Sequence, residues 1–188
     1  MFDATRNRIA AHMRRLLQGR LARRFVRQQD GAAAVEFALV AAPFLALTFA
    51  ILETAMVFFA GQTLEAASAD SARLIMTGQA QSAGFSQAQF KTQVCARIYG
   101  LFDCTNGLYV NVQTYSSYSA VNTALPISNG QFNTTMSYNP GDVGNIVVVS
   151  LYYQWPIYVS MLGNNLANLS GGNRLLSATA VFRVEPYK

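Results

Sequence analysis

The 188-residue chain has little charge and few of the side chains that catalytic sites require. Only 12% of its residues are charged, whereas 52% are hydrophobic, and this composition excludes a disordered tail as the main state. The one histidine, His12, lies near the N-terminus, and the sequence lacks a GxxxxGK phosphate-binding loop. After residue 60 there are only five acidic residues, without a cluster of nucleophile, base and orienting group. We therefore expect a protein that is not an enzyme.

The positive charge is concentrated at the N-terminus. Residues 1–31 contain eight arginines against Asp3 and Asp30, whereas residues 61–188 carry six basic and five acidic side chains. A basic surface on the folded part of the chain, as nucleic-acid binding would need, is therefore not predicted. We interpret the arginine-rich leader, residues 1–31, as a topology signal that contacts anionic lipid.

A long apolar segment follows this leader. Ala32 to Leu52 is a run of 21 residues with a single charge, Glu36, and a helix of that length spans roughly 30 Å of hydrocarbon. Basic residues favour the cytoplasmic side, so the leader is expected inside and the rest of the chain outside. The alternative is a secretory signal peptide, but its apolar stretch would be shorter and would end at a small-residue cleavage site.

The helical pattern continues beyond the span. Small and apolar residues recur every three or four positions, at Ala60, Leu64, Ala67, Ser71 and Leu74, and the charged Glu65, Asp70 and Arg73 lie away from that stripe. We expect one helix over residues 32–77, bent at Pro43 and stopped at Gly78, whose second half packs on an outer domain.

The remainder, residues 78–188, predicts an extracytoplasmic α+β domain. Residues 86–101 have a helical apolar face of Phe90, Val94, Ile98 and Leu101, with a capping box at Ser86 and Gln89. Strands are predicted at residues 107–114, 145–153 and 174–184, in an antiparallel sheet whose centre is the continuously apolar Ile146–Tyr153 run. Residues 115–142 are rich in turn formers and predict a surface excursion.

Cys95 and Cys104 are the only cysteines. A pair in an exported segment favours a disulfide over a metal site, which would need more ligands, and the alternative is two free thiols. Asp103 and Asp142 lack the ligand count of a Ca²⁺ loop. We expect neither a metal nor a cofactor.

Several motifs together resemble the TadE-like minor pilins, or pseudopilins, of the tight-adherence (Flp) pilus system. They are Gly31-Ala-Ala-Ala-Val-Glu36-Phe37, Glu53, Gln62-Thr-Leu-Glu65, Ala72-Arg73 with Gly78, Trp155-Pro156 and the ending Phe182-Arg-Val-Glu185-Pro186-Tyr187. The resemblance implies a pilin-like fold and a structural role in building an adhesion pilus. It also implies a bacterial inner-membrane location, with the major Flp pilin, other minor pilins and the inner-membrane assembly platform as partners.

The resemblance further implies that a prepilin peptidase cuts between Gly31 and Ala32, which makes Glu36 the fifth mature residue. The related major pilins have Glu-Tyr there, and Phe37 keeps the aromatic ring without its hydroxyl. Gly31 suits a scissile bond because it lacks a side chain and resists helix formation, although a glycine before a helix also serves as a cap or linker. The rival interpretation is an unprocessed, membrane-anchored binding module that recognises its target through residues 115–142.

Two glutamates stand at the ends of the apolar span. A carboxylate near the hydrocarbon edge costs up to a few kcal/mol, so Glu36 indicates a function or a partner, unless it is simply hydrated among the headgroups. Glu53, at the opposite end, is expected to be hydrated by the outer interface.

Overall fold

The computed structural model describes residues 31–98, 100, 102–159 and 166–187. The predicted leader, apart from Gly31, lies outside the described residues, as does Leu101. The chain divides into two compact units, one up to Thr48 and one from Phe49 onward.

A single long helix, α2, runs from Ala32 to Met76 and confirms the predicted helix to within one residue. It ends where the sequence predicts, because Gly78 adopts φ 76°, a left-handed conformation that favours glycine. A Cβ at Gly78 would also come within 2.1 Å of the Tyr187 ring. The C-terminal segment therefore packs tightly against the turn that ends α2.

The buried face of α2 lies within the second unit. Its buried residues are Val57, Ala60, Leu64, Ala67, Ser68, Ser71, Ala72 and Ile75. The predicted stripe is right up to Ser71, but it then continues to Ile75, and Leu74 is only half-buried. The step from Ser71 to Ile75 is four residues and follows another step of four, because a period of 3.6 residues needs more steps of four than of three. Glu65, Asp70 and Arg73 are exposed, as expected.

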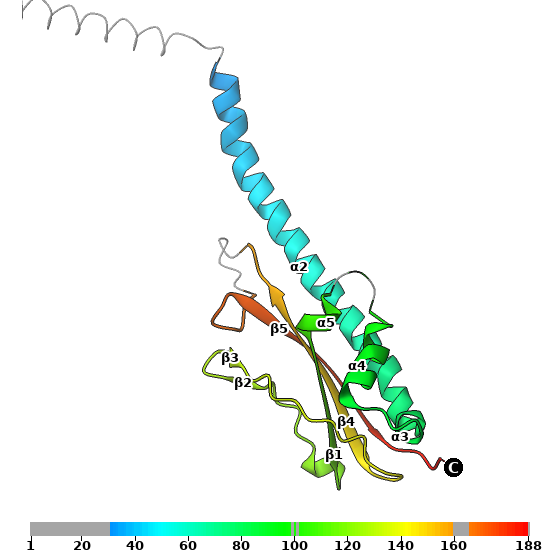
Figure 1. The fold of residues 1–188 in the computed structure, drawn as a ribbon. Coiled ribbons are helices and arrows are strands. Elements are labelled where there is room, and N and C mark those ends of the chain that lie inside the picture. The colour runs from blue at the N-terminus through cyan, green and yellow to red at the C-terminus, as the bar shows by residue number, and fades with distance from the viewer. Residues whose placement is uncertain (1–30, 99, 101, 160–165, 188) are drawn as a thin grey trace, which may run out of the picture. The chain divides into compact units, whose positions relative to one another are not determined.

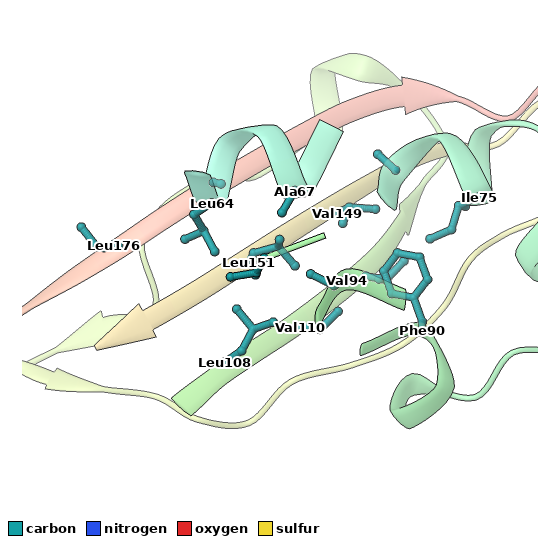
Figure 2. Packing of buried hydrophobic residues seen from close by; sticks show 14 of the residues in the cluster. Leu64, Ala67, Ile75, Phe90, Val94, Leu108, Val110, Val149, Leu151 and Leu176 are labelled. Carbon is teal, nitrogen blue, oxygen red and sulfur yellow. The ribbon is translucent and has the colours of Figure 1, made fainter. Parts of the chain in front are cut away.

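A three-stranded antiparallel sheet forms the other half of the core. Its order is β1 (Leu108–Tyr115), β4 (Ile146–Pro156) and β5 (Asn173–Arg183), with β4 in the centre as predicted. In Figure 1, the C-terminal half of α2 runs along one face of this sheet beside α4. Figure 2 shows Leu64 of α2 pointing toward Leu151 of β4, and Ile75 of α2 beside Phe90 of α4. All four are buried in one apolar cluster.

Helix α4 (Gln87–Cys95) begins with the predicted capping box, since Ser86 and Gln89 exchange side-chain and backbone hydrogen bonds. The prediction that it continues to residue 101 is wrong. Ile98 remains buried, but the chain has already turned, and Gly100 adopts φ 71°. Burial at helical spacing thus continued past the helix end because a turn can place one more apolar side chain in the same core. Two further helices, α3 (Gln79–Ser82) and α5 (Cys104–Gly107), are one turn each.

Residues 115–142 cover part of the second face of the sheet. They contain a 3₁₀ turn, η2 (Tyr118–Ala120), and a hairpin of β2 (Ile127–Ser128) and β3 (Gln131–Phe132). Phe132 packs edge-on against Tyr109, with ring centroids 4.9 Å apart, and reaches Tyr152 of β4. This second, smaller cluster covers Tyr152 of β4 from the side opposite α2, so the apolar run is buried on both faces there.

Candidate functional site

The junction between the leader and α2 is open. Gly31 precedes the first α-helical residue, Ala32, and every residue from 31 to 40 is exposed. A Cβ added at Gly31 would meet no atom within 4 Å. The peptide bond between Gly31 and Ala32 therefore lies at the start of the helix without steric cover from the described residues.

Glu36 and Phe37 lie in the first turns of α2 and point outward. Phe37 is 74% exposed, and Glu36 makes no hydrogen bond or ion pair within the part of the chain that the structure describes. Residues four apart lie on the same face of a helix, so the Glu36 carboxylate projects from the same side as Ala32. The structure thus places Ala32 and Glu36 one turn apart, and leaves both available to a partner.

The N-terminal part of α2 is apolar and uncovered. None of its apolar 18-residue window is buried, and by length and composition α2 is able to cross a membrane. The exposed large apolar side chains of this stretch are Val35, Phe37, Leu39, Val40, Phe44, Leu45, Leu47, Phe49, Ile51 and Leu52. Water is a poor solvent for such a surface, which is consistent with a membrane-anchored protein.

Glu53 has partners that the sequence did not reveal. One carboxylate oxygen accepts the Tyr158 N–H at 2.5 Å, and the other accepts the Val159 N–H at 2.9 Å. The side chain is partly buried and joins α2 to the segment that follows β4. Both partners are backbone groups more than a hundred residues away, so no local sequence pattern could have indicated them.

The predicted disulfide is confirmed. Cys95, the last residue of α4, is bonded to Cys104, the first residue of α5, with their Cα atoms 5.7 Å apart. Within the ring that it closes, Phe102 packs edge-on against Tyr153 of β4, with ring centroids 4.7 Å apart. The bond therefore fixes an aromatic contact between the helical segment and the sheet.

Asp103 has a structural partner rather than an open coordination sphere. Its carboxylate caps α5 by accepting the backbone N–H of Asn106 at 3.1 Å, and it also accepts the Asn106 side-chain N–H. These two hydrogen bonds hold the pKa of Asp103 below its usual value. Nearby, Lys91 donates to the Thr105 carbonyl at 2.8 Å, and partial burial lowers the pKa of Lys91. Among the residues that the structure describes, His, Cys, Asp and Glu side chains do not gather in threes.

Two of the motifs that carry the family resemblance, Gly78 and the C-terminal Glu185-Pro186-Tyr187, meet at the C-terminal end of α2. The Glu185 N–H donates to the Met76 carbonyl at 2.8 Å, which satisfies one of the carbonyls left open where the helix ends. Tyr187 lies against Gly78, and on the helix surface Gln62 donates to Glu65 at 3.4 Å. The Gly78 and Glu185-Pro186-Tyr187 motifs, far apart in sequence, thus stabilise one helix end.

The chain was compared with known families, curated proteins and solved structures. No curated protein and no solved structure matches it. Residues 31–73 match the model of the TadE-like protein family, from the glycine at the leader junction to Arg73 in the last turns of α2. The predicted resemblance is confirmed over these residues, which form a TadE-like segment, consistent with a membrane-anchored TadE-like protein of the Tad pilus system.

Proposed function

We propose that the chain is a minor pilin, or pseudopilin, that serves as a structural subunit rather than an enzyme in building an Flp-type adhesion pilus. The observation that carries this proposal is a shared boundary. The arginine-rich run ends before Gly31, the family match begins at Gly31, and α2 begins at Ala32. A protein that is cut from its leader before its helix enters an assembly needs such a boundary.

Processing by a prepilin peptidase follows from the same boundary. The enzyme needs an accessible backbone at the scissile bond, and the Gly31–Ala32 bond has no side-chain cover on the glycine. The leader then remains in the cytoplasm, the span of α2 lies in the inner membrane, and the second unit lies outside. The prepilin peptidase, the major Flp pilin, other minor pilins and the inner-membrane assembly platform are the expected partners.

Glu36 is assigned to assembly. Cleavage creates the α-amine of Ala32, whose reference pKa near 8 leaves it mostly protonated at neutral pH. Within one chain this amine lies one turn from Glu36 and could pair with it. We favour pairing between neighbouring subunits, because Glu36 is exposed and an ion pair in a low-dielectric setting would set the axial register of otherwise featureless helices.

The N-terminus of the protein from cells with an active prepilin peptidase tests the proposal. Intact mass and N-terminal sequencing should give a chain that begins at Ala32. Gly31→Val should accumulate the uncut form, because a β-branched side chain obstructs the scissile backbone without touching any described atom of the fold. Ala34→Val places the same side chain at an exposed position three residues later and should be cut normally.

Two results would contradict the proposal. If the wild-type chain keeps its arginine-rich leader in these cells, the unprocessed binding module is favoured instead. If Gly31→Val is cut as fast as the wild type, the junction lies elsewhere.

A further inference from the structure

We propose that the segment after β4, residues 157–159, lies on the outer surface of the lipid bilayer and that Glu53 holds it there. This segment is called the boundary loop below. The inference rests on the membrane anchorage in the proposed function, and adds a second contact with the membrane made by the outer domain itself.

The first observation is the position of Glu53 in α2. It directly follows the apolar run Ala32–Leu52, whose 21 residues span about 31 Å as a helix, the thickness of the hydrocarbon core. Glu53 therefore marks the outer end of the span. Because its carboxylate accepts the N–H groups of Tyr158 and Val159, the boundary loop lies at the same depth.

The second observation is the chemistry of the contact. A carboxylate at the hydrocarbon edge loses water, and an unpaired one there is costly. Two backbone N–H groups replace that water, one on each oxygen, and hydrogen bonds to a charged acceptor are stronger than neutral ones. The arrangement suits a place where water is scarce.

The third observation is the exposure of Tyr158. At 83% it is the most exposed of the large hydrophobic side chains that the structure describes. Tyrosine is enriched at the membrane–water interface, because its ring is apolar and its hydroxyl remains hydrated. The chain carries no charged side chain from residue 143 to 173, so the loop suits a neutral headgroup layer and has no charge to place there.

The exposed residues just beyond Glu53 favour lipid over a protein partner. Met56, Phe58 and Phe59 are all exposed, and three to six residues after Glu53 they lie about 5 to 9 Å further along the helix, the depth of a headgroup layer. At 100° per residue they point to different sides of α2. A docked helix would cover one stripe, whereas a bilayer covers every side of the helix that the second unit leaves exposed.

Depth-dependent fluorescence quenching tests the proposal on the full chain reconstituted in phosphatidylcholine bilayers. In a Trp155→Phe background, a single tryptophan is placed by Tyr158→Trp. The matched control is Tyr118→Trp, since Tyr118 is 59% exposed but belongs to η2. With bromine near the headgroup end of the acyl chains, the Tyr158→Trp emission should fall about twofold, whereas that of Tyr118→Trp should be unchanged.

A third reporter separates this inference from membrane anchorage itself. Phe44→Trp places the tryptophan within the apolar run, where bromine deep in the acyl chains should quench it. If Phe44→Trp is quenched but Tyr158→Trp behaves like Tyr118→Trp, the boundary loop does not touch lipid and the inference is wrong while anchorage holds. If Phe44→Trp is not quenched, anchorage and the inference both fail.

The role of Glu53 is tested in the same reporter. Glu53→Ala removes both acceptors and should reverse most of the Tyr158→Trp quenching, and Glu53→Gln, which keeps one carbonyl acceptor, should be intermediate. Glu65→Ala removes an exposed carboxylate from the same helix and should leave the quenching unchanged. Equal quenching in the reporter protein with and without Glu53→Ala, with the Cys95–Cys104 bond formed as evidence of folding, would overturn the holding role.

Discussion

Removing the disulfide should measurably destabilise the second unit without unfolding it. The bond joins Cys95 and Cys104, nine positions apart, and so closes a ring of about ten residues. The chain-entropy relation for a ring of that size gives about 2.7 kcal/mol of stabilisation. For a unit that starts at Phe49, a loss of that size corresponds to a fall in Tm of about 5 to 10 °C.

The assay compares the wild type with Cys95→Ser/Cys104→Ser in detergent micelles. An unreduced digest analysed by mass spectrometry should first show the two cysteine peptides linked. Thermal unfolding is then followed by near-ultraviolet circular dichroism of Trp155, whose ring lies 5.9 Å from that of Phe102 inside the closed loop. The signal therefore reports the aromatic contact that the bond fixes.

Reductant provides the control for this experiment. It should lower the Tm of the wild type toward that of the double variant, and it should not change the double variant. Recovery of both cysteines alkylated without prior reduction would refute the bond. A double variant with the Tm of the oxidised wild type would refute the entropic argument. The bond would then not stabilise the fold by lowering the entropy of the unfolded chain.

Three further substitutions test other parts of the structure. In urea unfolding, Ser68→Ala should raise the free energy of unfolding by about 1 kcal/mol, because the buried Ser68 hydroxyl has no hydrogen-bond partner among the described residues. The matched control, Ser71→Ala, removes a hydroxyl that donates to the Ala67 carbonyl and should not raise it. Asp103, whose pKa is lowered by its hydrogen bonds, stabilises the fold above its ordinary titration range and loses that effect as the pH falls through its lowered pKa, so Asp103→Asn should flatten the acid limb of a Tm–pH curve. Glu36→Ala should still be inserted and cut, but most of its co-purification with pilin partners should be lost, with Glu36→Asp intermediate; partner recovery equal to wild type would contradict the register role.

The sheet could be predicted from sequence because each strand shows in its own residues whether one face or both faces are buried. The alternating pattern predicts both ends of β1 and β5 to within one residue of the observed bounds, and the unbroken apolar run identifies β4 as the central strand. The pattern understates β4, which continues to Pro156, because Gln154 interrupts the apolar run without interrupting the pairing with β5. Pairing is a property of the backbone, and side-chain hydropathy reports it only indirectly.

The end of α4 shows the opposite error. Phe90, Val94 and Ile98 keep helical spacing, and all three are buried, but the helix ends between the second and the third. Periodicity records which side chains face the core, and a turn held by the bond from Cys95 keeps Ile98 on that side. The C-terminal end of α4 could be predicted only from the geometry of the ring that Cys95 and Cys104 close, and the sequence pattern does not give that geometry.

The two glutamates of α2 differ in the kind of partner that each can have. Glu53 accepts backbone N–H groups, which every residue but proline offers, so only the fold could identify its partners. Glu36 stands in a stretch where other polar groups are already engaged: the Thr48 hydroxyl, for example, donates to the Phe44 carbonyl of its own helix. From Ala32 to Leu52 the Glu36 carboxylate is the one charged group on an apolar surface that lipid or another helix must cover. Apolar contact between helices is nearly indifferent to a shift along their axes, whereas a carboxylate is satisfied at few positions. We therefore expect an axial register for this helix to depend on Glu36 far more than on the many apolar residues around it.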